Sequence, residues 1–413
     1  MKKRKTKILI VGAGPAGLSC SLFLSKMKIE HILLEKEKFP RDKVCGDALS
    51  GKVIELLKKL DPELVRKLNA ETRQVGSWGV NFYAPNGKKL RIPFKQDFDK
   101  STLPPGNISK RIDFDNFLFE EAQKSPYAEI IEESPALKYE RTEKGYIAQT
   151  AQKEFECNLL IAADGAYSRF AKDFGNITME PNHYCAGIRA YYQGVSGMDK
   201  DNFIELHFLK DLLPGYFWIF PLPNGAANVG LGMRSDVLRK KKLDLKKMLP
   251  EVIASNPELK ARFQNAEPEG KTSGFGLPLG SKKRALCGDH FMLLGDAASL
   301  IDPFTGEGIG NAMFCGMYAA EIANKALSQN DFKKTVLQDY EHKVYKRMWD
   351  ELKLSRRLQQ LVKFPFLFNF VVNKAARNQT LRETISCMFE DLDIRERLKQ
   401  PSFYFKLIFN QTQ

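Results

Sequence analysis

Two glycine-rich segments and one aromatic segment hold the residues best suited to chemistry. In the first segment, Gly12, Gly14 and Gly17 directly follow the apolar run of residues 7–11, which is typical of a buried parallel strand. In this order the first glycine permits a tight turn, the second lets a pyrophosphate approach the backbone, and the third lets a helix pack on the strand. The N-terminus of that helix faces the phosphates with unpaired N–H groups. The segment therefore predicts a dinucleotide-binding site.

An acidic residue supports the same interpretation. A second apolar run, residues 31–34, leads to Glu35, which lies 18 residues after Gly17. This spacing is close to the ~20 residues at which an acid binds a ribose hydroxyl of the cofactor. Both NAD and FAD satisfy this pattern, so the choice between them rests on the rest of the chain.

The second glycine-rich segment follows a strand-like run at residues 292–294. It begins with Gly295 and Asp296 and ends where a helical pattern starts near Gly308. Small residues let the backbone approach a flat ligand, and an aspartate after a strand suits a polyol chain. The helix N-terminus places positive charge where a reduced flavin ring gathers negative charge.

The aromatic segment covers residues 216–232. On a strand, Tyr216, Trp218 and Phe220 point to one face, and three rings on one face wall a long apolar pocket. Considered alone, the pattern favours an ordinary aromatic core stripe.

Together these segments resemble the geranylgeranyl reductases, flavoenzymes of the para-hydroxybenzoate-hydroxylase-like superfamily that hydrogenate isoprenoid double bonds. That family carries Tyr-x-Trp-x-Phe-Pro followed by Gly-x-Gly, and the chain matches every specified position. Flavin-dependent halogenases carry Trp-x-Trp-x-Ile-Pro at the comparable place, which is a poorer match. The resemblance selects FAD as the cofactor.

Three further motifs carry the resemblance. Arg111 opens an Arg-x-x-Phe-Asp-x-x-Leu segment and Asp164 an Asp-Gly motif, and both imply cofactor contact, although capping of a strand end explains Asp164 equally well. Residues 40–46 resemble the family's Pro-Arg-x-Lys-x-Cys-Gly loop beside the flavin. Cys45 tunes the flavin or accepts a transient adduct in one interpretation and is a small buried thiol in the other. The chain departs from the family's glycine-rich continuation at residues 47–48.

The resemblance thus implies three sets of residues. Those expected to bind the cofactor are Gly12, Gly14, Ala16, Gly17, Glu35, Arg41, Cys45, Gly46, Arg111, Asp164, Gly295, Asp296, Pro303, Gly306, Gly308 and Ile309. Those expected to bind the substrate are Tyr216, Trp218, Phe220, Pro221, Gly230 and Gly232. The residues expected to act in catalysis are Tyr216, Trp218 and Cys45.

Alternation of polar and apolar residues near 75–95 and 184–233 predicts an antiparallel sheet. Because cofactor motifs lie on both sides of these regions, we expect an α/β fold in which a Rossmann-like FAD-binding domain is interleaved with an antiparallel-sheet substrate domain, followed by a helical C-terminal region. The expected ranges are 1–74, 107–180 and 282–330 for the first domain, 75–106 and 181–281 for the second, and 331–413 for the helical region.

Composition limits the location and the partners. The 413 residues carry a formal net charge of +14, which indicates either attraction to an anionic membrane surface or a solvated lysine-rich surface. No nucleic-acid motif, metal-ligand cluster, signal peptide or membrane span is visible, so we expect a cytoplasmic protein. If the positive charge is attracted to an anionic membrane surface, we expect this protein to be membrane-associated. The apolar residues 364–372 favour a buried helix packed on the flavin domain over a segment that dips into a membrane interface or covers a lipid channel.

The resemblance implies two-electron reduction of an isoprenoid C=C bond, in which reduced flavin delivers hydride to one carbon and a proton reaches the other. The sequence assigns no proton donor beyond Tyr216 or a water as candidates, leaves NAD(P)H, ferredoxin or a quinol as the electron source, and gives no oligomeric state. The competing hypotheses are a monooxygenase or halogenase that acts through a flavin hydroperoxide, and a non-catalytic flavin-binding protein.

Overall fold

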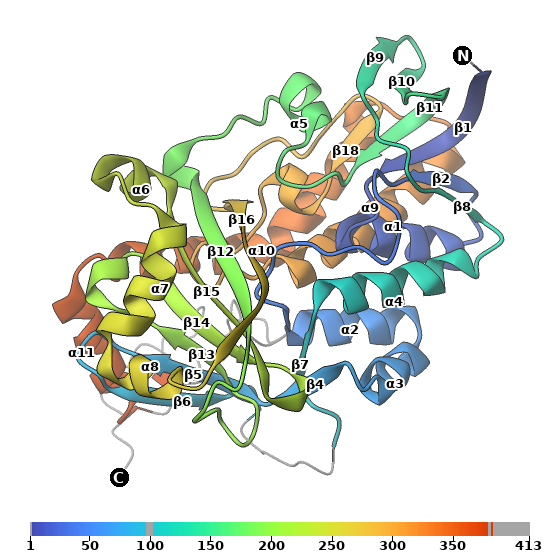
Figure 1. Cartoon of the computed structure of the whole chain (residues 1–413). Helices are drawn as coiled ribbons and strands as arrows, with labels where there is room; N and C mark the ends of the chain where they lie inside the picture. Colours follow the sequence, from blue (N-terminus) through green and yellow to red (C-terminus); the bar gives the residue numbers. More distant parts are fainter. Residues whose placement is uncertain (1, 96–101, 379–380, 383–413) are drawn as a thin grey trace.

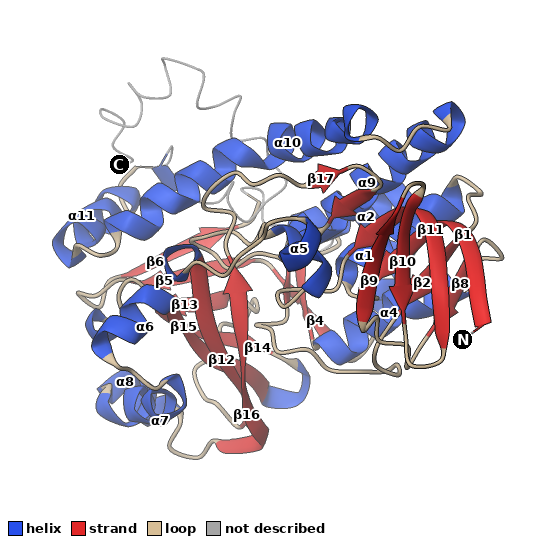
Figure 2. Cartoon of the chain, turned by 90° about the horizontal axis from the view of Figure 1, so that it is seen from above, coloured by secondary structure: helices blue, strands red, loops and turns tan. Residues whose placement is uncertain are grey.

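The computed structural model describes residues 2–95, 102–378 and 381–382. Within these residues the strands form an eight-stranded, a seven-stranded and a three-stranded sheet. The two large sheets lie side by side, and one long helix, α10 (Lys334–Leu361), extends from the first to the second (Figures 1 and 2). The site described below forms where these sheets meet.

The eight-stranded sheet has a parallel centre in the order β18-β11-β1-β2-β8, with β17 at one edge and the β9–β10 hairpin attached to β11. Residues 8–11 are buried, as expected for a strand covered on both faces. The strands are β1 (Lys2–Val11), β2 (His31–Leu34), β8 (Ala128–Ile131), β9 (Lys138–Thr142), β10 (Gly145–Gln149), β11 (Lys153–Ala162), β17 (Cys287–Gly288) and β18 (Phe291–Leu293).

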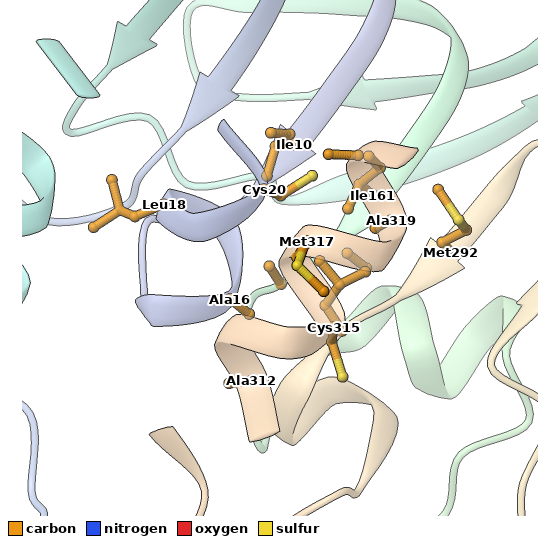
Figure 3. Close-up of a cluster of buried hydrophobic side chains, with 14 of the residues drawn as sticks. Ile10, Ala16, Leu18, Cys20, Ile161, Met292, Ala312, Cys315, Met317 and Ala319 are labelled. Carbon is orange, nitrogen blue, oxygen red and sulfur yellow. The ribbon is translucent and has the colours of Figure 1, made fainter. Parts of the chain in front are cut away.

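Helices α1 and α9 pack closely against each other beside this sheet (Figure 3). Small residues make the approach possible: a Cβ atom at Gly316 would lie 2.5 Å from the carbonyl oxygen of Ala16. The Ser19 hydroxyl also donates a hydrogen bond to the Met313 carbonyl at 2.8 Å. Because the two glycine-rich segments each lead into one of these helices, this contact brings both cofactor motifs to one place. The helices around this sheet are α1 (Pro15–Lys26), α2 (Gly51–Leu60), α3 (Pro62–Ala70), α4 (Arg111–Gln123), α5 (Arg169–Phe174) and α9 (Ile309–Gln329).

The seven-stranded sheet runs in the order β16-β12-β15-β14-β13-β5-β6. It is antiparallel except for the pair β13–β5, which is parallel. Its strands come from chain segments that interrupt the first sheet, so the expected interleaved α/β fold is confirmed. The strands are β5 (Gly79–Tyr83), β6 (Lys89–Pro93), β12 (Tyr184–Gln193), β13 (Ile204–His207), β14 (Tyr216–Pro221), β15 (Ala226–Arg234) and β16 (Glu267–Pro278).

Strand β14 has two different faces. Phe217 and Ile219 pack in the cluster that holds residues of α7 and α8, whereas Trp218 and Phe220 pack on the opposite side, with Tyr216 partly buried beside them. The expected alternation is confirmed, and it points the three signature rings away from the covering helices. Those helices are α6 (Ser235–Lys241), α7 (Leu245–Ser255) and α8 (Pro257–Arg262).

A small sheet in the order β3-β7-β4 was not expected from the sequence. Its strands are β3 (Ala48–Leu49), β4 (Gln74–Ser77) and β7 (Gly106–Ser109). Segments of two to four residues are too short to show a period, so only tertiary pairing defines them. Strand β3 begins directly after the 40–46 loop and fixes where that loop ends.

The C-terminal region is helical as far as it is described, with α10 (Lys334–Leu361) and α11 (Pro365–Ala375); residues 383–413 of the expected region lie outside the described residues. The expectation that residues 364–372 form a buried helix on the flavin domain was wrong. Helix α11 buries Phe368 and Val372 against the seven-stranded sheet, and its outer face is exposed. No helix among the described residues is long and apolar enough to cross a membrane.

Candidate active site

One cavity of about 790 Å³ runs from the end of β2 to the aromatic face of β14. Its wall includes residues of both glycine-rich segments, the 40–46 loop and the seven-stranded sheet. The size lies within the range typical of ligand sites. The cavity therefore joins a dinucleotide-type end to an aromatic end.

The dinucleotide end is built by the first glycine-rich turn. A Cβ atom at Gly12, whose φ is +100°, would lie 2.5 Å from the Ala163 carbonyl oxygen, and one at Gly17 would overlap with the Gly12 carbonyl, so both positions require glycine. At Gly14, by contrast, no atom lies within 4 Å of a Cβ position. Gly14 also precedes α1 without a side-chain cap. The turn thus leaves open space and helix N–H groups where a phosphate binds.

Glu35 lies at the carboxyl end of β2, as the ribose-binding interpretation requires. Its Oε2 accepts a hydrogen bond from the Ala13 backbone N–H at 2.7 Å, and its Oε1 accepts one from Glu37 N–H at 3.0 Å. The carboxylate is therefore fixed in the cavity wall, where it can accept further hydrogen bonds from hydroxyl groups.

Arg111 lines the cavity but is already paired. Its guanidinium donates two hydrogen bonds of 2.7 Å to Asp115, and Arg41 donates to the same carboxylate at 2.6 Å. Arg41 also donates to the Ala13 carbonyl at 2.9 Å. The arrangement ties the 40–46 loop to α4 and to the glycine-rich turn, so both arginines position the wall of the site.

Two aspartates face the middle of the cavity. Asp164 is half-buried, its Oδ1 is buried without a hydrogen-bond partner among the described residues, and burial raises its pKa to about 6. Asp296 forms an ion pair of 2.9 Å with Lys43, a residue that the sequence analysis did not single out. An unpartnered buried carboxyl oxygen suits a ligand that brings its own donors, such as the hydroxyls of a dinucleotide.

The loop before α9 is tied to the aromatic strand. The Tyr216 hydroxyl donates to the Thr305 carbonyl at 2.7 Å, and burial raises the pKa of this tyrosine. Asp302 Oδ1 accepts hydrogen bonds from the N–H groups of Phe304 and Thr305 at 2.9 and 2.8 Å. The Tyr216 proton is therefore committed to a carbonyl of the cofactor loop.

The Gly-x-Gly signature forms a seat for Trp218. A Cβ atom at Gly230 would lie 2.2 Å from the Ile188 carbonyl oxygen and 2.3 Å from the indole ring, and one at Gly232 would lie 3.8 Å from the ring. The indole N–H donates to Asn228 Oδ1 at 2.8 Å. The two glycines thus act through the tryptophan, and β15 sets the position of its ring.

Gly46 has a similar spatial role. A Cβ atom at Gly46 would lie 2.8 Å from the Phe220 ring, so this glycine lets the 40–46 loop approach β14. The Cys45 side chain lines the cavity, is half-buried, and has a raised pKa because of burial. The thiol therefore stays neutral near pH 7.

Most of the sequence-predicted residues come together. The cavity wall includes Gly12, Gly14, Ala16, Glu35, Arg41, Cys45, Gly46, Arg111, Asp164, Asp296, Gly306, Gly308, Ile309, Tyr216, Trp218 and Phe220. The predicted residues that do not line it are Gly17, Gly295, Pro303, Pro221, Gly230 and Gly232. The wall also contains Lys43, Asp47 and Arg189, which the sequence analysis missed as site residues. For Asp47 a signal existed, because the chain departs there from the family's glycine-rich pattern.

The arrangement fits FAD. Gly14 leaves space for the pyrophosphate, Glu35 is positioned for the adenosine ribose, and Asp164 offers an unpartnered oxygen. When bound, FAD would supply two-electron chemistry to a substrate in the same cavity.

Comparisons with known proteins agree with this geometry. A family model described as FAD binding domain matches residues 5–200, and one described as geranylgeranyl reductase catalytic domain matches residues 185–267. The digeranylgeranylglycerophospholipid reductase of Methanocaldococcus jannaschii is 31% identical over 86% of the chain and 87% of the relative. The menaquinone reductase of Mycobacterium tuberculosis is 26% identical over 87% of the chain and 84% of the relative.

Two solved structures show the same fold. A geranylgeranyl bacteriochlorophyll reductase-like protein from Thermoplasma acidophilum has a TM-score of 0.77 and 24% identity, and the match covers 99% of this chain and 97% of that one. A flavin-dependent brominase also has a TM-score of 0.77, with 21% identity over 94% and 93% of the two chains. The fold is thus common to reductases and halogenases, and only the sequence comparisons separate them.

Proposed function

The chain belongs to the geranylgeranyl reductase family of FAD-dependent oxidoreductases, and we propose that it saturates carbon–carbon double bonds in the prenyl chains of a membrane lipid. The observation that carries this proposal is the single cavity, in which the FAD-type residues continue into an aromatic and aliphatic arm. A substrate in that arm meets the cofactor without leaving the cavity.

The arm suits a long hydrocarbon. Its wall includes the buried side chains of Leu49, Phe94, Ile204, Leu206, Trp218 and Phe220. Burial of an alkyl chain against such a surface contributes about 0.8 kcal/mol per CH₂ group. Polar groups are few there, so the arm binds length and apolarity more than a specific pattern of hydrogen bonds.

The same wall suits the charge that develops in the reaction. An isolated alkene is a poor hydride acceptor, so its reduction requires a transition state with cationic character. The Trp218 ring lies 6.1 Å from Tyr216 and 6.2 Å from Phe220 between ring centroids. Ring faces stabilise a nearby cation, and the hydrogen bond from Trp218 to Asn228 keeps the indole in place.

Helix α11 supports a membrane location for the lipid substrate. Its outer face carries Phe366 and Phe370, which are 68% and 63% exposed, with Phe364 at 52% just before it. Its inner face packs Phe368 and Val372 into the cluster that contains Trp218 and Phe220. We infer that α11 rests on the membrane directly beside the cavity, where it gives a prenyl chain a short route into the arm.

The charges near α11 indicate which lipids it contacts. The segment 362–382 contains Lys363, Lys374, Arg377 and Arg382 and no acidic residue. Burial and the nearby Arg234 and Arg356 lower the pKa of Lys363, and Asp236, which pairs with Arg234, opposes this shift. An apolar face flanked by cations favours an anionic lipid surface.

Vesicle sedimentation tests the membrane contact. We expect binding to phosphatidylglycerol-containing vesicles, weaker binding to phosphatidylcholine vesicles, and at least a tenfold loss in the double variant Phe366→Ser and Phe370→Ser. The control Leu137→Ser removes an apolar side chain elsewhere that is 47% exposed. Equal binding by the double variant and the control would contradict the role of α11.

The activity test uses the FAD-loaded protein, reduced anaerobically and mixed with digeranylgeranylglycerophospholipid or menaquinone. Flavin reoxidation together with products heavier by about 2 Da per reduced bond would support the proposal. Reoxidation only on admission of oxygen, with halide-dependent product formation, would instead support the halogenase alternative that the shared fold allows. Mass spectra of the two lipids also separate the substrates named for the relatives.

A further inference from the structure

Asp47 occupies an unusual position in the cavity wall. It follows the Cys45–Gly46 pair, is completely buried, and has a φ of +68°, in the left-handed region that side chains rarely adopt. Its backbone carbonyl accepts a hydrogen bond from Ser109 at 3.0 Å, which anchors it to the three-stranded sheet. A strained, buried carboxyl group in a cavity wall indicates a functional constraint.

The two carboxyl oxygens of Asp47 have different surroundings. Oδ2 accepts hydrogen bonds from Asn228 Nδ2 at 2.7 Å and from the Tyr191 hydroxyl at 2.8 Å. Oδ1 is buried and has no hydrogen-bond partner among the described residues. The carboxyl group is therefore oriented by one oxygen, and the other is left available to hold a proton.

The same asparagine connects Asp47 to the aromatic wall. Asn228 accepts a hydrogen bond from the Trp218 indole and donates to the Cys45 carbonyl at 2.8 Å as well as to Asp47. One amide thus fixes the acid, the loop and the indole relative to one another. Asp47 and Trp218 both line the cavity and are joined through this one amide.

Other acids in this part of the wall are less suitable. The Tyr216 hydroxyl is committed to the Thr305 carbonyl, and burial raises the pKa values of Tyr216 and Cys45, so both groups hold their protons. Burial also raises the pKa of Glu307, but its Oε1 accepts a hydrogen bond from the Gly310 N–H at the start of α9. Burial also raises the pKa of Asp47, to about 6, against the opposing effects of Asn228, Tyr191, Arg189 and Arg111. A carboxyl group with this pKa is protonated in part of the molecules near neutral pH and releases its proton far more readily than a phenol.

We propose that Asp47 is the general acid that protonates the alkene during prenyl reduction, an inference that rests on the proposed function. In each reduction, the hydride that the cofactor supplies adds to one alkene carbon, and the O–H bond of Asp47 breaks as its proton forms a C–H bond to the other carbon. The π electrons form that second bond, and no further oxidant or reductant is required. The resulting carboxylate is held by Tyr191 and Asn228 and regains a proton from solvent after product release.

Asp47→Asn is the decisive variant. Asparagine also tolerates positive φ, and its amide oxygen accepts the same two hydrogen bonds, so the fold and the Trp218 position are preserved. We expect turnover to fall by at least ~10²-fold, while KM for the lipid and the affinity for FAD change by less than about threefold. The matched control is Asp244→Asn, an exposed helix cap whose acceptor function asparagine retains, and we expect its turnover to stay unchanged.

A second measurement needs no turnover. Infrared difference spectra of the cofactor-free protein, recorded during a pH titration, should show a protonated carboxyl band that titrates near pH 6 and is absent in Asp47→Asn. Asp164, whose pKa is also raised to about 6, contributes a separate band that is identified by Asp164→Asn. Comparison of the variants therefore assigns the band.

The outcomes separate the two proposals. Turnover of Asp47→Asn within threefold of the wild type, or the absence of an Asp47 band, would overturn the role of Asp47 while prenyl reduction stands. If wild-type protein reduces no prenyl lipid, the proposed function fails, whatever the infrared titration shows. We also expect the activity of the wild type to decline as the pH rises through the pKa of Asp47, and we expect no such decline in Asp47→Asn.

Discussion

Protonation of Asp47 has a consequence for stability that requires no substrate. Burial raises its pKa from 3.8 to about 6 in the folded protein. A carboxyl group with a raised folded-state pKa contributes stability that is fully present below its unfolded-state pKa and is lost as the pH rises through its folded-state pKa. The wild type should therefore lose stability relative to Asp47→Asn as the pH rises, because asparagine does not titrate.

The size of this effect follows from the shift. About two pKa units at 1.36 kcal/mol each correspond to a relative loss of about 3 kcal/mol between low and high pH. About half of that loss falls above pH 5, where most proteins remain folded. Because Asp47 is fully buried, solvent screening does not reduce it greatly.

Urea unfolding of the FAD-loaded wild type and of Asp47→Asn can be measured in parallel between about pH 5 and pH 8. The difference isolates the contribution of Asp47 ionisation to the free energy of unfolding, since all other groups titrate alike in both proteins. We expect the free energy of unfolding of the variant to gain ~1–2 kcal/mol over the wild type across this range. A constant difference would show that Asp47 ionises normally. An opposite trend would show that Arg189 and Arg111 outweigh burial.

Three further substitutions follow from the geometry. Gly230→Ala should displace the Trp218 ring, cost about 1–3 kcal/mol and shift the tryptophan fluorescence. Tyr216→Phe should remove the hydrogen bond to the Thr305 carbonyl and weaken FAD binding about fivefold, or ~1 kcal/mol, as measured by quenching of flavin fluorescence. Lys52→Met should leave Glu351 buried without its ion-pair partner, 2.5 Å away, and cost about 3–5 kcal/mol. Unchanged melting of that last variant would contradict the buried pair.

Local patterns were enough to predict the parts of the fold that depend on short-range rules. The order of strand, glycines, helix, strand and acid predicted the centre of the first sheet. Alternation along residues 216–220 predicted which rings share a face, because side chains alternate on any strand. The resemblance then linked the second glycine-rich segment to the first, a contact that no local pattern contains.

The features that the sequence left hidden depend on residues distant in the chain. Gly230 was expected to bind substrate, but it does not line the cavity, and a Cβ atom there would meet the Ile188 carbonyl and the Trp218 ring of the neighbouring strands. Asn228 connects Trp218 to Asp47 across 181 positions, and no spacing rule reports such a contact. Helix α11 was expected to be buried because its composition is apolar, and only the packing shows that half of that surface has nothing described against it.

The equal TM-scores to a reductase-like protein and to a brominase show that this fold alone does not identify the reaction. We expect the wall opposite the cofactor motifs to determine the reaction of this chain, through its fit to an extended hydrocarbon and through a proton donor in the same cavity. In this chain the seat of Trp218, the orienting amide of Asn228 and the carboxyl group of Asp47 form one hydrogen-bonded unit. Because that unit joins the cofactor loop to the substrate sheet, a change in any member should affect both the placement of the alkene and its protonation. The reduction chemistry is therefore best tested at this unit, not at the flavin motifs shared across the fold.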